Sequence, residues 1–128
     1  MKLLLDTNVF IWLNDAPQRV RAQVMTIIAN SDNDLFLSLT SIWELQIKIQ
    51  LGKLQLSDAL PDILRTQQVD NNLQILTINL SHIWALENLP YHHRDPFDRL
   101  LIAQAQIEGM TLVSADGMFE LYDVDLLW

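Results

Sequence analysis

The sequence predicts an α/β domain of three layers, in which helices cover both faces of a central, mostly parallel sheet of four to five strands. The main observation is that short apolar runs alternate with longer segments of helical periodicity, as in successive βαβ units. The run Leu3-Leu4-Leu5 is typical of a strand that is buried on both faces. The chain of 128 residues contains no repeat, low-complexity stretch or linker, so residues 1–128 are expected to form one domain.

In chain order, the first half is expected to form a strand, two helices, a strand and a helix, at residues 3–5, 9–14, 19–30, 35–38 and 41–51. Pro17 separates the first two helices, and Val20, Val24 and Ile28 give the second its apolar stripe. Gly52 is a typical residue for the end of the third helix.

The second half is expected to begin with a helix N-capped by Ser57, whose apolar stripe includes Leu60 and Ile63. A proline at position 61 is tolerated there because it falls in the first turns. The remaining elements are expected to be strands at 73–77, 111–114 and 124–127 and helices at 81–88 and 96–108, the last of which ends at Gly109.

The composition excludes several classes of protein. Half of the residues are apolar and four are tryptophan, which argues against disorder. No apolar run approaches the roughly 18–20 residues that span a bilayer, and Asp6 interrupts the apolar start, so we expect a cytoplasmic protein without a membrane segment. Cysteine is absent, which excludes disulfides, zinc thiolates and thiol catalysis.

The net charge of −8 argues against a broad nucleic-acid surface, which normally carries an excess of lysine and arginine. Two explanations keep a nucleic-acid function open. Some of the acids are neutralised by divalent cations in one site, or the protein uses a basic partner.

Four acids fall where a parallel sheet gathers its functional groups. Asp6 and Asp116 follow predicted strands, and Glu44 and Asp98 lie in the first turns of predicted helices. Sites in open parallel sheets form at the carboxyl ends of the strands. The sequence therefore predicts one carboxylate cluster at this edge.

Each acid also has a purely local explanation. Asp6 suits the N-cap of the next helix, and Ser41-Ile42-Trp43-Glu44 matches a capping box in which Glu44 bonds back to Ser41. Lys48, four residues on, is placed to pair with Glu44. Asp95 suits an N-cap before a proline.

The first-turn position of Asp98 and the Asp116-Gly117 turn pair likewise need no catalytic role. The combination of the four acids favours a metal site, because oxygen ligands suit Mg²⁺ or Mn²⁺. Thr7 and Asn8 are expected to support the acids as neighbouring donors. The histidines, His82, His92 and His93, lack metal-ligand spacing, and the His92-His93 pair is expected in a loop with local hydrogen bonds.

These segments together resemble the PIN-domain ribonucleases, and most closely the toxin half of VapBC-type toxin–antitoxin pairs. The resemblance covers nearly the whole chain in four ordered motifs. They are Leu3-Leu4-Leu5-Asp6-Thr7-Asn8-Val9-Phe10-Ile11-Trp12, Ser41-Ile42-Trp43-Glu44-Leu45 with the later Lys48 and Leu51-Gly52-Lys53-Leu54, the run from His92 to Ala105, and Thr111-Leu112-Val113-Ser114-Ala115-Asp116.

The resemblance implies a PIN-like α/β/α fold and endonucleolytic RNA cleavage that depends on Mg²⁺ or Mn²⁺. It implies an RNA substrate, a small antitoxin as inhibitor, and a homodimer or a toxin–antitoxin hetero-oligomer. By motif, Asp6, Glu44, Asp98 and Asp116 match the catalytic, metal-binding acids of the family. Thr7, Asn8 and Ser114 match positions beside them, and Asp95 is assigned to capping.

We expect Asp6, Asp98 and Asp116 to hold one or two ions while Glu44 completes the site or orients water. One alternative is a Mg²⁺-binding signalling module of flavodoxin-like topology, which needs an Asp after the third strand, where Ile78-Asn79-Leu80 stands instead. The other is a catalytically silent α/β interaction domain. Most of the apolar residues that could dock a partner are expected to pack in the core; they are Trp12, Ile27, Ile28, Trp43 and Ile47.

Overall fold

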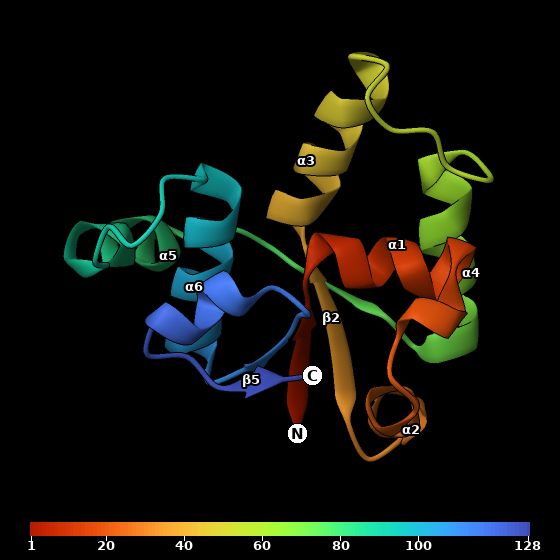
Figure 1. The fold of residues 1–128 in the computed structure, drawn as a ribbon, viewed down its shortest axis with the longest axis horizontal. Coiled ribbons are helices and arrows are strands. Elements are labelled where there is room, and N and C mark those ends of the chain that lie inside the picture. The colour runs from red at the N-terminus through yellow and green to blue at the C-terminus, as the bar shows by residue number, and fades with distance from the viewer.

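The computed structural model describes residues 1–128 and contains one five-stranded sheet in which every neighbouring pair of strands is parallel. The strands follow the order β3-β2-β1-β4-β5. In Figure 1 the first strand, in red, lies between β2 and β5. Their bounds are β1 Lys2–Leu5, β2 Asp34–Ser38, β3 Gln74–Leu76, β4 Thr111–Val113 and β5 Leu126–Leu127. The prediction of a mostly parallel sheet of four to five strands is confirmed.

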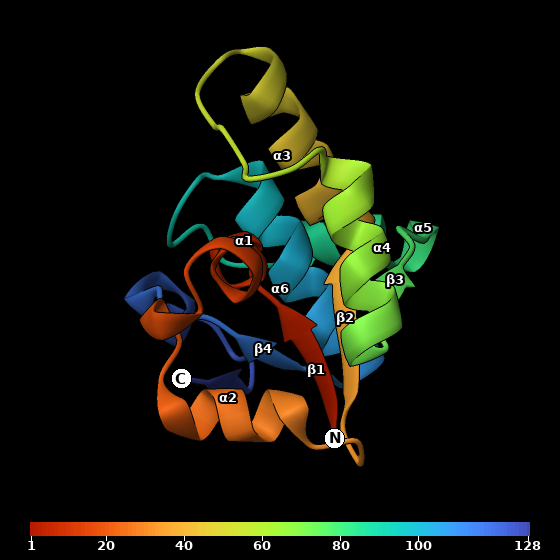
Figure 2. The same cartoon turned by 90° about the vertical axis from the view of Figure 1, so that its right-hand side faces the viewer.

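Six α-helices and three short 3₁₀ segments complete the chain. Helices α1, α2 and α4 lie on one side of the sheet and α5 and α6 on the other, as the two views show (Figures 1 and 2). Their bounds are α1 Thr7–Asp15, α2 Ala22–Ala29, α3 Leu39–Gln50, α4 Leu60–Asn71, α5 Leu80–Ala85 and α6 Pro96–Glu108, with 3₁₀ turns at Pro17–Arg19, Leu86–Asn88 and Gly117–Leu121. The three-layer prediction is therefore confirmed.

Strand β1 is buried on both faces, which explains its three consecutive leucines. Leu3 and Leu5 belong to the apolar cluster that contains α1, α2 and α4, whereas Leu4 belongs to the cluster beneath α6. All three side chains are fully buried. Because successive side chains of a strand point to opposite faces, a strand covered on both sides has no position for a polar residue.

Helix α6 has the bounds that its sequence predicts, since both of its ends carry strong signals. Asp95 occupies the N-cap, Pro96 follows at the first helical position, and Gly109 ends the helix in the left-handed region at φ 64°. This helix is the most precisely delimited element, and it carries Asp98 into the site.

Several predicted helix starts are wrong, and two of them have a clear physical reason. Helix α2 begins at Ala22 rather than at Arg19, because Pro17–Arg19 forms a 3₁₀ turn. Helix α4 begins at Leu60 with Ala59 at the N-cap position, and Ser57 does not cap it. The Ser57 hydroxyl instead donates to Asp15 Oδ1 at 2.7 Å, a contact across 42 residues that local pattern cannot reveal.

None of the six helices combines the length and the hydropathy that a membrane-spanning helix requires.

Candidate active site

A small, entirely polar pocket lies at the carboxyl ends of β1 and β4, and all four predicted acids line it. The pocket has a volume of about 140 Å³. The topology explains the convergence, because adjacent parallel strands deliver the residues that follow them to the same edge. Its lining consists of Asp6, Thr7, Asn8, Glu44, Lys48, Asp95, Asp98 and Asp116.

Asp6 is held by a residue from the neighbouring strand rather than by its own helix. It occupies the N-cap position of α1 without making a side-chain capping bond. Its Oδ2 accepts a hydrogen bond from the Ser114 hydroxyl at 2.7 Å, and Ser114 Oγ in turn accepts the amide N–H of Asp116 at 3.0 Å. Ser114 therefore lies beside the acids, as predicted, and links the two acids that follow β1 and β4.

The capping-box interpretation of Glu44 is wrong. Helix α3 begins three residues earlier than that interpretation requires, with Ser38 as its N-cap accepting from the Thr40 amide. Glu44 is thus free to turn toward the pocket, where the Thr7 hydroxyl donates to its Oε1 at 2.8 Å. Lys48 donates to Oε2 at 3.0 Å, which confirms the predicted pairing over one helical turn.

Asp98 projects from the first turn of α6 while Asp95 caps that helix. Asp95 Oδ1 accepts the backbone N–H groups of Phe97 at 2.9 Å and of Asp98 at 3.1 Å, so its predicted capping role is confirmed. The Asp98 side chain is 21% exposed, and its Oδ2 lies 3.5 Å from Nε2 of His93. Capping by Asp95 therefore leaves the Asp98 carboxylate available to the pocket.

The two remaining predicted residues line the pocket more loosely. Asn8 is exposed and makes no side-chain hydrogen bond to the acids. Asp116 Oδ1 accepts the Met118 amide at 2.9 Å, which gives the predicted turn at Asp116-Gly117 a capping role. One carboxylate oxygen of Asp116 is therefore already engaged by backbone.

Burial and the neighbouring acids raise the pKa values of two carboxyl groups in the pocket. Burial raises the pKa of Asp98 to about 7, with smaller increases from the negative charges of Asp95, Asp6, Glu44 and Asp116. Burial also raises the pKa of Asp6, although its hydrogen bond from Ser114 acts in the opposite direction. The pocket is therefore a place where negative charge is unfavourable until a cation or a proton compensates it.

The donor set fits a hard divalent cation. The acids that converge on the pocket offer only oxygen atoms, the ligands preferred by Mg²⁺ and Mn²⁺. No group of three acidic or histidine side chains has the arrangement needed to hold an ion by itself. Mg²⁺ is commonly bound by one or two carboxylates together with several waters, so the pocket does not need a complete protein cage.

Sequence reasoning missed a group of residues behind Asp98. Arg99 is buried, and its guanidinium donates to the carbonyls of Pro90 at 2.7 Å and Leu89 at 3.1 Å. Tyr122 binds the same loop through its hydroxyl, which contacts His92 and His93. The loop before α6 is thus fixed from two sides. His92 and His93 lie in this loop, as predicted, but their hydrogen bonds are not local, because Tyr122 is 29 residues from His93.

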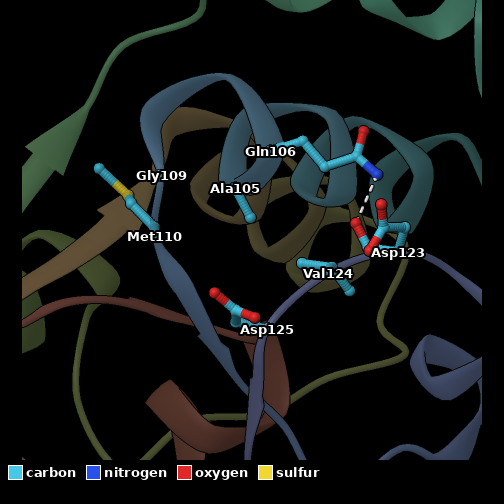
Figure 3. A pocket seen from close by; sticks show the side chains of 7 residues that line it. All are labelled: Ala105, Gln106, Gly109, Met110, Asp123, Val124 and Asp125. Atoms are coloured by element: carbon cyan, nitrogen blue, oxygen red, sulfur yellow. Dashed lines mark hydrogen bonds between the residues drawn. The ribbon is translucent and has the colours of Figure 1, made fainter.

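A second pocket, of about 400 Å³, lies at the opposite edge of the sheet, where β4 and β5 begin (Figure 3). Its lining includes Asp123 and Asp125 beside the end of α6, and Gln106 Nε2 donates to the backbone carbonyl of Asp123 at 2.8 Å. This pocket contains only the carboxylates of Asp123 and Asp125, so it does not match the group of four acids at the other edge of the sheet.

The strand order separates this fold from one alternative. A flavodoxin-like signalling module has the order 2-1-3-4-5, in which strand 3 lies beside strand 1. Here β3 lies at the edge beside β2, and β4 is the neighbour of β1. The residues after β3 also carry no acid before α5 begins at Leu80.

The sheet order and the acid pocket define an α/β domain with an acidic site at the carboxyl edge, and the comparisons identify the family. The sequence profile of the PIN domain matches residues 3–125. The chain therefore belongs to the PIN-domain family, whose members are generally nucleases. Curated protein sequences contain no match.

Solved structures share this fold at low sequence identity. The chain is similar to a chain of the Rickettsia felis VapBC2 complex bound to a promoter DNA fragment, with TM-score 0.74, 17% identity, and coverage of 99% of this chain and 98% of that one. It is also similar to a chain of VapBC-1 from nontypeable Haemophilus influenzae, with TM-score 0.69, 17% identity, and coverage of 99% and 97%. For VapBC-5 of Mycobacterium tuberculosis the TM-score is 0.58, the identity 18%, and the coverage 98% and 97%.

Proposed function

We propose that this protein is a metal-dependent endoribonuclease and the toxin of a toxin–antitoxin pair. The observation that carries the proposal is the convergence of Asp6, Glu44, Asp98 and Asp116 on one polar pocket in a PIN domain. The raised pKa values of Asp6 and Asp98 support it, because burial, with a smaller contribution from neighbouring acids, makes their negative charge unfavourable until a divalent cation compensates it.

Asp6, Asp98 and Asp116 would hold Mg²⁺ or Mn²⁺ in this pocket, and Glu44 would orient the attacking water. When bound, such an ion activates water and stabilises the charge of a phosphoryl group during displacement. Ser114 and Thr7 keep Asp6 and Glu44 in place through the hydrogen bonds described above. Lys48 is the one cationic side chain in the pocket, and it balances part of the charge of Glu44.

The proposed reaction is hydrolysis of an RNA phosphodiester. The water oxygen forms a bond to phosphorus, the bond from phosphorus to the 3′-oxygen breaks, and that oxygen leaves with a proton as a 3′-hydroxyl. The products are then a 5′-phosphate and a 3′-hydroxyl end. The ribose 2′-hydroxyl takes no part, so no cyclic phosphate forms.

Purified protein should cleave RNA when Mg²⁺ or Mn²⁺ is added and should stop when EDTA removes the ion. The variant Asp6→Asn should lose cleavage, because it removes a buried carboxylate from the pocket and keeps a side chain of the same size. Sequencing of the new ends should find 5′-phosphates. A folded wild-type protein that leaves RNA intact with either ion would contradict the proposal and favour the silent interaction domain.

We further propose an antitoxin as partner, since complexes of this kind provide the structural neighbours. With a net charge of −8, the protein suits a basic partner. An arginine of that partner, directed at the carboxylates of the pocket, would inhibit cleavage directly. A homodimer or a toxin–antitoxin hetero-oligomer would follow from such a complex.

The candidate docking surface is an apolar groove of about 490 Å³ between α3 and α4. Of the five apolar residues singled out in the sequence, Trp43 is the one that lines it, and it is 60% exposed. By contrast, Ile28 is buried in the core, and Trp12 packs against Trp128 with ring centroids 5.9 Å apart.

Co-expression tests this surface. A short reading frame beside the gene should encode a protein that co-purifies with the wild type and inhibits RNA cleavage. The variant Trp43→Arg should lose co-purification and keep cleavage. Retention of the complex by this variant would place the partner elsewhere.

A further inference from the structure

His93 has a buried ring nitrogen that lies beside Asp98 and has no hydrogen-bond partner. Its Nε2 lies 3.5 Å from Asp98 Oδ2 without making a hydrogen bond. A buried polar atom without a partner is rare in folded proteins and calls for an explanation.

The hydroxyl of Tyr122 determines which ring nitrogen of His93 carries the proton. Its oxygen accepts the backbone N–H groups of His92 and His93, each at 3.1 Å. A hydroxyl oxygen has two acceptor positions and one proton to donate, so these two amides occupy its acceptor capacity. The Arg99 guanidinium lies farther from the same oxygen, at 3.5 Å.

The proton of the Tyr122 hydroxyl is therefore left for His93 Nδ1, which lies 2.8 Å from the oxygen. A nitrogen that accepts a hydrogen bond carries no proton, and in a neutral imidazole the other nitrogen then carries it. The proton of His93 accordingly resides on Nε2, the nitrogen nearest Asp98.

We infer that His93 is a positioning residue, whose Nε2–H group holds the Asp98 carboxylate in place and whose tautomer is fixed by Tyr122. The inference rests on the proposed function in one respect, which is that Asp98 binds the metal. The N–H group lies 3.5 Å from Oδ2 in the structure, and in this proposal the distance shortens to a hydrogen bond when the ionised carboxylate binds an ion through its second oxygen. Side chains that hydrogen-bond a ligating carboxylate commonly contribute about 10–100-fold to metal affinity or activity.

Nuclear magnetic resonance tests the tautomer without metal or RNA. The protein has three histidines, so variants of each assign the ring signals unambiguously. In the metal-free wild type at pH 8, the ¹⁵N shifts of His93 should show a protonated Nε2 and an unprotonated Nδ1. Tyr122→Phe should lose this preference, because it removes the hydroxyl and keeps the aromatic ring. A wild-type ring with its proton on Nδ1 would overturn the inference.

Mn²⁺ binding tests the consequence for Asp98. His93→Phe, which keeps a planar ring without the N–H group, should weaken Mn²⁺ binding on the order of tenfold. His93→Gln offers an amide N–H near the position of Nε2 and should recover part of the affinity. His92→Phe is the matched control, because His92 is exposed and its side chain makes no hydrogen bond, and it should bind like the wild type.

The outcomes separate this inference from the nuclease proposal. If the wild type cleaves RNA and His93→Phe binds Mn²⁺ as tightly as the wild type, the positioning role is wrong and the nuclease stands. If Mn²⁺ binding depends on His93 and RNA stays intact, the positioning role stands and the nuclease is wrong. Should His93→Phe not fold, Tyr122→Phe gives the same comparison, because it removes the hydroxyl that keeps the proton of His93 on Nε2.

Discussion

At the scale of single residues, burial makes the ionised form of Asp98 unfavourable in the folded protein. Its pKa is about 7 in the folded protein, against an ordinary value of 3.8. The folded state therefore binds a proton that the unfolded state releases between about pH 4 and 7. The cost of ionised Asp98 is absent below this window and complete above it, and it is on the order of 2–4 kcal/mol.

The stability of the metal-free protein should consequently fall as the pH rises from 5 to 8. Urea unfolding in EDTA at several pH values measures this, and Asp98→Asn should flatten the fall because the amide cannot ionise. Asp58→Asn is the matched control, since it removes the same charge from an exposed position. A decline that is equally steep in Asp98→Asn and the wild type would place the penalty on other groups.

Asp98→Asn, which removes a cost to stability, should at the same time impair catalysis. Asp98→Asn should lower kcat/KM for RNA cleavage on the order of 100-fold or more, because a neutral amide replaces a carboxylate ligand in the site. Its stability in EDTA at pH 8 should nevertheless equal or exceed that of the wild type. Gain of stability with loss of activity distinguishes a functional carboxylate from a structural one; cleavage at the wild-type rate would remove Asp98 from the site.

At the scale of elements, the N-terminus of α6 combines an acid that caps the helix with an acid that lines the pocket. Asp95 caps the helix, and three residues later Asp98 faces the pocket. The charge of Asp95 also contributes to the raised pKa of Asp98. One short segment thus fixes the helix and sets the electrostatic environment of the site.

Replacement of Asp95 should separate these two effects. Asp95→Ala should destabilise the protein by about 1 kcal/mol through loss of the two capping bonds, whereas Asp95→Ser should retain most of the stability. Both variants should lower the pKa of Asp98, since both remove the charge. Chemical unfolding and carboxyl ¹³C titration measure the two quantities, and equal stability of the two variants would contradict the capping role.

The exact bounds of an element could be predicted from sequence where strong signals mark both ends, and not where only one end is marked. Asp95, Pro96 and Gly109 delimit α6, so its bounds agree with the prediction. For α3, Ser41 and Glu44 match a local capping pattern, but the helix begins at Leu39 and Glu44 bonds to Thr7, 37 residues away. Tertiary hydrogen bonds override such patterns because they satisfy the same polar groups in a way that the local sequence does not encode.

At the scale of the whole molecule, the convergence of the acids could be predicted because it follows from topology. A parallel α/β sheet brings the residues after β1 and β4 to one edge wherever those strands are neighbours. The Tyr122–His93 contact could not be predicted in this way, because it joins two irregular segments whose paths no periodicity specifies. The buried Arg99 likewise has carbonyl partners that belong to a loop.

A bound ion should stabilise the whole fold, because it binds the folded protein and not the dispersed acids of the unfolded chain. Mn²⁺ at 100 times its dissociation constant should raise the free energy of unfolding by about 2.7 kcal/mol. Thermal unfolding with and without the ion measures this gain, and Asp6→Asn should lose most of it. An equal rise in Tm for the variant would mean that the ion binds outside the pocket.

The hydrogen bond from Ser114 to Asp6 joins residues that are 108 positions apart, and this separation matters during synthesis of the protein. On the ribosome, the first strand emerges long before its neighbour at Thr111–Val113 has been translated. Neither the Ser114 contact nor the Asp116 carboxylate exists until that late segment is added. A nascent polypeptide with this order of elements therefore carries an incomplete pocket, which is finished only when the late strand Thr111–Val113 pairs with the first strand of the chain.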